Sequence, residues 1–92
     1  MAEVVVTLRI MPQNPGTDLS KIESEAKKKV VKFCNSQEFK ASIEPIAFGL
    51  NALNLIFVMN EDKGSTEELE KSISETHGVE SVEVTDVRRA IG

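Results

Sequence analysis

Side-chain catalysis needs a nucleophile beside a base, a spaced pair of carboxylates or a cluster of metal ligands. None of these arrangements is found in the 92 residues of this chain. Cys34 is the single cysteine, and His77 is the single histidine, with no nucleophile spaced around it. The glutamates at 67, 68 and 70 cluster at the start of a predicted helix, where the helix dipole accounts for them. We therefore expect no catalytic residue, no metal site and no cofactor, and we predict a domain that binds another protein.

Two features remain unusual, and the first is an aromatic residue in the stretch "EPIAFG". Phe48 follows Pro45 by three residues and precedes Gly49, where a turn would normally use small polar residues. Proline stiffens the approach and glycine leaves space beside the backbone. We predict that Phe48 is held out at the end of the sheet as an anchor for a partner. The alternative is that its ring simply covers the end of the sheet.

The second feature is the basic pair Arg88 and Arg89 in an acidic part of the chain. Residues 1–46 hold seven basic and six acidic residues, whereas residues 47–92 hold four and nine, which together give the net charge of −4. An acidic second half argues against direct nucleic-acid binding, because phosphate contacts need a basic face. The two arginines stand out against this acidic background, and one interpretation is that they are solubilising residues at a frayed terminus.

Composition predicts one small globular domain over residues 1–92. The chain is 40% hydrophobic and 28% charged, with no tryptophan or tyrosine. No apolar run approaches the roughly 20 residues of a membrane helix, and the N-terminus lacks the features of a signal peptide. With a single cysteine, these features predict a cytoplasmic protein that does not engage a membrane.

Hydrophobic periodicity predicts six elements that must position these residues. Alternating residues predict strands, and apolar residues at spacings of three and four predict helices. Thr17 or Asp18 is the expected N-cap of the first helix, and Ser65 with Glu68 has the spacing of a capping box for the second. The expected order is strand 4–10, helix 17–33, strand 37–45, strand 50–59, helix 65–78 and strand 79–89.

Two strand–helix–strand units in succession predict an α+β fold. Right-handed crossovers give a ferredoxin-like βαββαβ sandwich, in which a four-stranded antiparallel sheet carries two helices on one face. The first and third strands are central in this topology, and they are the two most apolar strands of the chain. The fold does not choose the function, because it hosts many.

The stretches "EPIAFGLNALNLIFVM" and "GVESVEVTDVRRAIG" resemble the archaeal-type elongation factor 1-beta family, and the resemblance extends over the whole chain. It implies guanine-nucleotide exchange on elongation factor 1-alpha, the GTPase that brings aminoacyl-tRNA to the ribosome. It further implies that Phe48, flanked by Ala47 and Gly49, enters an apolar pocket on the second domain of that GTPase. A basic C-terminal residue, Arg89 with Arg88 beside it, would approach the magnesium and phosphate site.

The chain also departs from the related eukaryotic domain. Arginine stands where the eukaryotic domain has lysine, and the strand after the motif begins with Asn51 and Ala52 instead of basic residues. The chain lacks the eukaryotic subunit's long N-terminal region, so we expect a monomer that acts alone. A small regulatory or ligand-sensing domain of ferredoxin-like fold is the alternative function.

Overall fold

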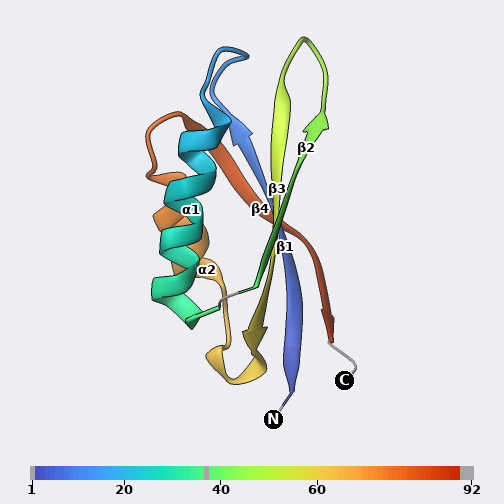
Figure 1. The fold of residues 1–92 in the computed structure, drawn as a ribbon, viewed down its shortest axis with the longest axis vertical. Helices are drawn as coiled ribbons and strands as arrows, with labels where there is room; N and C mark the ends of the chain where they lie inside the picture. Colours follow the sequence, from blue (N-terminus) through green and yellow to red (C-terminus); the bar gives the residue numbers. More distant parts are fainter. Residues whose placement is uncertain (1, 37, 90–92) are drawn as a thin grey trace.

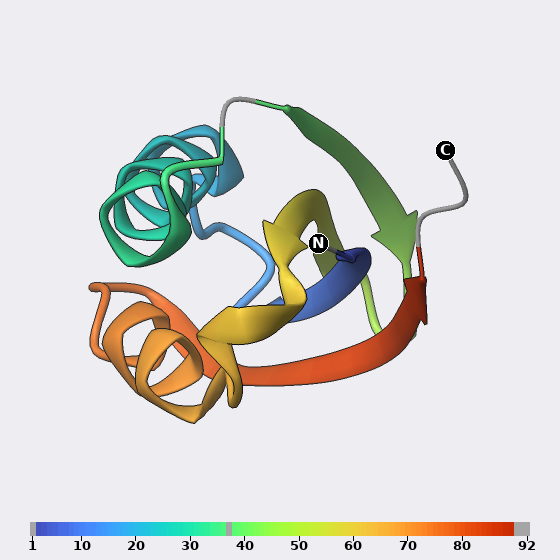
Figure 2. The same cartoon turned by 90° about the horizontal axis from the view of Figure 1, so that it is seen from below.

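The predicted ferredoxin-like architecture is confirmed. The computed structural model describes residues 2–36 and 38–89, with both helices on one face of a four-stranded antiparallel sheet (Figures 1 and 2). The strand order is β2-β3-β1-β4, so the first and third strands are central, as expected. The elements are β1 (Glu3–Pro12), α1 (Leu19–Cys34), β2 (Phe39–Pro45), β3 (Asn51–Asn60), the short 3-10 helix η1 (Glu61–Lys63), α2 (Glu67–Ser74) and β4 (Val79–Arg89).

The core lies between the helices and the two central strands. Alternate residues of β1 and β3 face the helices because side chains along a strand point to opposite faces in turn. Burying each large aliphatic or aromatic side chain stabilises the fold by about 1.5–3 kcal/mol. The buried residues of this core cluster are Val6, Leu8 and Ile10 of β1, Leu53, Leu55, Phe57 and Met59 of β3, Ile22, Ala26 and Val30 of α1, Leu69 and Ile73 of α2, and Val79 of β4.

The first helix begins as predicted. Asp18 is its N-cap, and its carboxylate accepts hydrogen bonds from the backbone N–H groups of Ser20 at 3.0 Å and Lys21 at 3.4 Å. These bonds satisfy two of the N–H groups that a helix start leaves without partners. At its other end, Asn35 adopts the left-handed conformation, with φ of 56°, which asparagine tolerates better than most residues.

The predicted capping box of the second helix is wrong. The N-cap of α2 is Thr66, whose hydroxyl donates to the Glu70 carboxylate at 2.9 Å instead of binding the backbone. The Ser65 hydroxyl accepts from the backbone N–H of Glu67, not from that of Glu68. The two-residue spacing forms an ST-type turn before the helix, which competes locally with the capping box.

The second helix also ends earlier than predicted, at Ser74. The chain then turns, and Gly78, with φ of 94°, leads directly into β4. A Cβ added at Gly78 would lie 2.9 Å from Cγ2 of Thr17. Glycine is therefore needed here for two reasons, its backbone conformation and the close approach of the segment before α1.

We predict that Gly78→Ala lowers the free energy of unfolding by about 2–4 kcal/mol, because left-handed strain and a steric clash add. Gly64→Ala is the matched control, since Gly64 also has a positive φ, 75°, but has no neighbour within 4 Å of the added Cβ. It should lose only the cost of its backbone conformation, about 1–3 kcal/mol, because its ψ of −135° is also disfavoured for alanine. Urea unfolding of both variants measures the difference, and equal losses would contradict the clash.

Candidate functional site

The tip of the β2–β3 hairpin is a tightly hydrogen-bonded turn. The backbone N–H of Leu50 donates to the carbonyl of Ala47 at 3.0 Å, and that of Ile46 donates to the carbonyl of Leu50 at 2.9 Å. Phe48 and Gly49 lie at the two central positions with φ of 58° and 79°. Two successive positive φ values are typical of a type I′ turn, which normally carries Asn-Gly.

Phenylalanine is an unusual residue at this position for two reasons. A bulky side chain in the left-handed region costs roughly 1 kcal/mol relative to a conformation it prefers. The Phe48 side chain is also 96% exposed, so burial within the domain does not compensate for the strain. The alternative that this ring covers the end of the sheet is therefore wrong. Neither local preference nor packing explains the phenylalanine, and such strain is typical of functional positions.

Two isoleucines extend the apolar surface at this end of the molecule. Ile46 is 42% exposed and Ile43 is 50% exposed. The register opposes Ile43 to the buried Leu53, so its side chain is on the helix-covered face with Phe39 and Ala41. Ile43 is nevertheless half exposed, because β2 is an edge strand and has no neighbouring strand on its outer side. Ile43, Ile46 and Phe48 are thus exposed together at this end of the sheet.

Arg88 and Arg89 lie in the sheet, at the last two positions of β4. They pair with Val5 and Val4 of β1, respectively. Because consecutive residues of a strand face opposite sides, Arg89 is on the helix-covered face with Val4, and Arg88 is on the helix-free face with Val5. Both side chains are exposed. The final residues of the matching stretch, 90–92, lie outside the described residues.

Each arginine is engaged by an acidic residue. Nε of Arg88 lies 2.8 Å from a carboxylate oxygen of Asp86 on its own strand. Nη2 of Arg89 lies 3.0 Å from a carboxylate oxygen of Glu61 in η1. The basic end of β4 is therefore partly neutralised within the chain.

The structure does not bring the two predicted groups of site residues together. Arg89 of β4 pairs with Val4 of β1, and Val4 in turn pairs with Met59 of β3. The hairpin tip lies at the other end of β3, just before Asn51. These eight residue steps of strand (59 − 51) correspond to about 26 Å. The groups thus lie at opposite ends of the long axis of a molecule measuring 42 × 22 × 19 Å (Figure 1). A partner that contacts both must reach along most of the sheet.

A polar network on the helix-free face was not predicted from the sequence. The Arg9 guanidinium on β1 lies 3.3 Å from Glu44 of β2 and 3.7 Å from Glu83 of β4, and the Asn54 amide of β3 donates to Glu44 at 3.0 Å. The Asn54 hydrogen bond, followed by the charge of Arg9, lowers the pKa of Glu44. The network joins all four strands below the hairpin tip, since Glu44 immediately precedes Pro45. Its sequence signal was the recurrence of polar residues at alternate positions of the strands.

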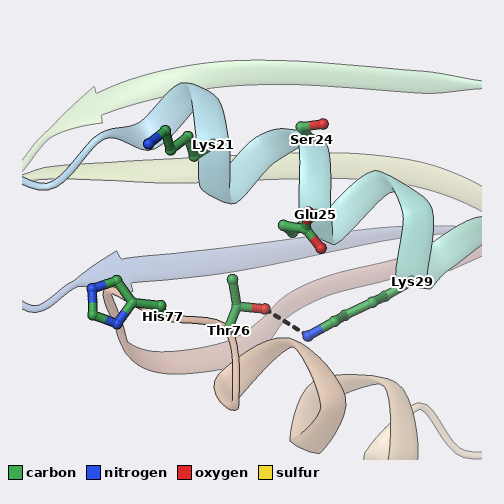
Figure 3. A pocket seen from close by; sticks show the side chains of 6 residues that line it. All are labelled: Lys21, Ser24, Glu25, Lys29, Thr76 and His77. Atoms are coloured by element: carbon green, nitrogen blue, oxygen red, sulfur yellow. Dashed lines mark hydrogen bonds between the residues drawn. The ribbon is translucent and has the colours of Figure 1, made fainter.

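The alternative ligand-sensing function would need a pocket. A depression of about 530 Å³ between α1 and the turn that follows α2 is lined by Lys21, Ser24, Glu25, Lys29, Thr76 and His77 (Figure 3). Lys29 is already engaged there, because its Nζ donates to the carbonyl of Ser72 at 2.6 Å and to the hydroxyl of Thr76 at 2.7 Å. Its charge thus binds the C-terminal end of α2, as the helix dipole favours. Lys29 thus ties α1 to the end of α2.

The described part of the chain offers no group of three side chains suited to a metal ion. Among its helices, none has the length and apolar character needed to span a membrane.

Comparison with known proteins identifies the family to which this chain belongs. Residues 5–90 match the family described as the EF-1 guanine nucleotide exchange domain. The chain therefore belongs to this family of guanine-nucleotide exchange factors, which act by binding and not by covalent catalysis.

Archaeal relatives named elongation factor 1-beta match over nearly their whole length. The protein from Methanothermobacter thermautotrophicus is 42% identical over 97% of this chain and 98% of its own. The protein from Methanobrevibacter smithii is 43% identical over the same shares, and that from Methanococcoides burtonii is 41% identical over 99% of this chain and all of its own. The resemblance to the archaeal-type elongation factor 1-beta family is thus confirmed.

We predict that the network around Glu44 contributes to stability in a pH-dependent way. The pKa of Glu44 is lower in the folded chain than its ordinary value, so its contribution is present at neutral pH. The contribution is lost as the pH falls from the ordinary glutamate range through the lower, folded-state pKa. Urea unfolding should therefore show Glu44→Gln to be less stable than the wild type at pH 7, with a smaller difference at pH 3.

Glu80→Gln is the control for removing one negative charge, because Glu80 is exposed and has no ion pair in the part of the chain that the structure describes. A Glu44→Gln difference that is the same at both pH values would contradict the role of the carboxylate.

Proposed function

We propose that this chain is an elongation factor 1-beta, a single exchange domain over residues 1–92 that promotes exchange of GDP for GTP on elongation factor 1-alpha. Membership of the EF-1 exchange family supports the proposal. The observation that carries its mechanism is Phe48, which is 96% exposed on a turn that phenylalanine disfavours. The protein would act as a monomer in the cytoplasm, without contacting nucleic acid or membrane directly.

The hairpin tip would supply affinity. An exposed aromatic ring is an effective anchor because it buries a large apolar area while few rotatable bonds are immobilised. Ala47 and Gly49 beside it are small, so both sides of the Phe48 ring stay accessible to a pocket on the second domain of the GTPase. Burying the ring would stabilise the complex by about 1.5–3 kcal/mol.

The basic end of β4 would supply the acceleration of exchange. Bound Mg²⁺ clamps nucleotide phosphates in a GTPase. A guanidinium brought near that site is repelled by the metal and attracted to its acidic ligands and to phosphate. Both effects destabilise the state in which metal and nucleotide are bound. Arg89, with Arg88 beside it, is the candidate for this role.

The separation of the two ends favours different roles for them, with the hairpin tip binding the GTPase and the arginine end promoting nucleotide release. One rigid sheet joins the tip to the arginines, so docking at one end raises the effective concentration of the other end near its site. A factor that binds the bound and nucleotide-free states equally would not shift the equilibrium between them. The tip can bind both states, whereas the arginine end has to favour the state from which nucleotide has loosened.

The direct test is an exchange assay with elongation factor 1-alpha from the same organism, loaded with fluorescent GDP. The wild-type chain at micromolar concentration should accelerate GDP release, and no acceleration would refute the proposal. Arg89→Ala should slow exchange by more than it weakens association, because it removes an interaction specific to the loosened state. Arg88→Ala, measured alongside, identifies the arginine with the larger effect.

We predict that Phe48→Asn separates stability from binding. Asparagine tolerates the left-handed conformation, so the variant should be as stable as the wild type or up to about 1 kcal/mol more stable. It lacks the ring, so association with the GTPase should weaken about 10- to 100-fold. Thermal unfolding and titration calorimetry measure the two effects.

Phe48→Tyr is the matched control, since it keeps an aromatic ring on the same turn and should retain most of the affinity. An asparagine variant that is clearly less stable than the wild type would mean that Phe48 serves packing. A Phe48→Asn variant that binds the GTPase as tightly as the wild type would refute the anchoring role of Phe48.

A further inference from the structure

The ion pair between Arg89 and Glu61 joins two elements that are distant in sequence. Nη2 of Arg89 donates to Oε1 of Glu61 at 3.0 Å, across 28 residues of chain. The Arg89 side chain is 73% exposed and that of Glu61 is 43% exposed, so the pair is accessible from solvent. A partner approaching this end of the molecule would therefore meet the pair directly.

Glu61 is held in place by its own backbone. Its N–H donates to the carbonyl of Ala2 at 3.0 Å, and its carbonyl accepts from the N–H of Gly64 at 3.2 Å. The side chain of Asn60 accepts from the N–H of Asp62 at 3.1 Å and caps the short helix η1. In Figure 1, η1 lies at the same end of the molecule as the start of β1 and the end of β4. The carboxylate is thus presented from a fixed turn.

The two arginines differ in how they are engaged. The partner of Arg88 is Asp86, two residues earlier on the same strand. The partner of Arg89 belongs to a different element, so the pair ties the end of β4 to the turn between β3 and α2. Because the two side chains are on opposite faces of β4, Glu61 acts on Arg89 specifically.

We propose that Glu61 restrains exchange by neutralising Arg89 in the free protein, an inference that rests on the proposed exchange function. A positive side chain acts on an anionic site through its net field, and the paired carboxylate cancels much of that field at a distance. To engage phosphate or acidic magnesium ligands, Arg89 has to leave Glu61. The carboxylate also faces the same anionic site and is repelled by it. Glu61 thus positions Arg89 while lowering its effect.

Glu61→Gln tests the proposal because it removes the charge and keeps the shape and a hydrogen-bond acceptor. Exchange on elongation factor 1-alpha at low salt should become about two- to fivefold faster, the modest size expected for an exposed ion pair. Raising the salt concentration should reduce the gain, since the interaction is screened. A slower or unchanged rate at low salt would overturn the proposal.

Asp62→Asn is the matched control. Asp62 adjoins Glu61 in η1, is exposed, and makes no ion pair with either arginine within residues 2–36 and 38–89. It removes the same charge from the same turn, so a gain equal to that of Glu61→Gln would show a general field effect and overturn the specific pairing.

The decisive comparison is made in the Arg89→Gln background. If Glu61 acts through Arg89, adding Glu61→Gln there should leave the exchange rate unchanged, whereas an equal gain in both backgrounds would refute the coupling. The wild-type rate in the same experiment tests the proposed function separately. Acceleration by the wild type together with no effect of Glu61→Gln would reject only the restraint.

Discussion

The antiparallel pairing of β1 with β3 is the constraint on which the rest of the structure depends. It sets Val6 opposite Phe57, Leu8 opposite Leu55 and Ile10 opposite Leu53, and all six side chains are buried. A shift of one residue would move this apolar set to the helix-free face, so the register is strongly specified. The same register sends the hairpin tip and the end of β4 to opposite ends of the sheet. The spacing between the two candidate contacts is therefore a consequence of core packing.

The hairpin tip illustrates how a stable core permits a locally unfavourable residue. Phe48 combines a positive φ with almost complete exposure, and both are unfavourable in the isolated domain. The turn around it is fixed by two backbone hydrogen bonds, and the network of Arg9, Glu44 and Asn54 braces the strands below it. A preorganised anchor loses little freedom on binding, which favours tight association. The strain at the tip is thus consistent with a surface selected for binding.

The sequence was sufficient for the fold and for the exposed aromatic, because both follow from local signals. Alternating apolar residues identify β1 and β3, and Pro45 with Gly49 frames Phe48. The other contacts could not be predicted, because they depend on how strands distant in sequence pair in the fold. The Arg89–Glu61 contact depends on where β4 ends relative to η1, and the Arg9 network requires residues from four strands to meet. The wrong capping box at Ser65 arose because a serine can also form a turn that precedes the helix, which spacing alone does not distinguish.

We propose that both ends of one sheet engage the GTPase. Backbone amide NMR of the labelled chain, with and without nucleotide-free elongation factor 1-alpha, tests this directly. We predict that the largest changes fall in two separate groups, at residues 46–50 and at residues 87–89 with the adjacent turn 61–63. Amides on the exposed faces of α1 and α2 should change least, because neither helix contains a candidate contact residue. Changes concentrated on those helices, with residues 46–50 unaffected, would contradict it.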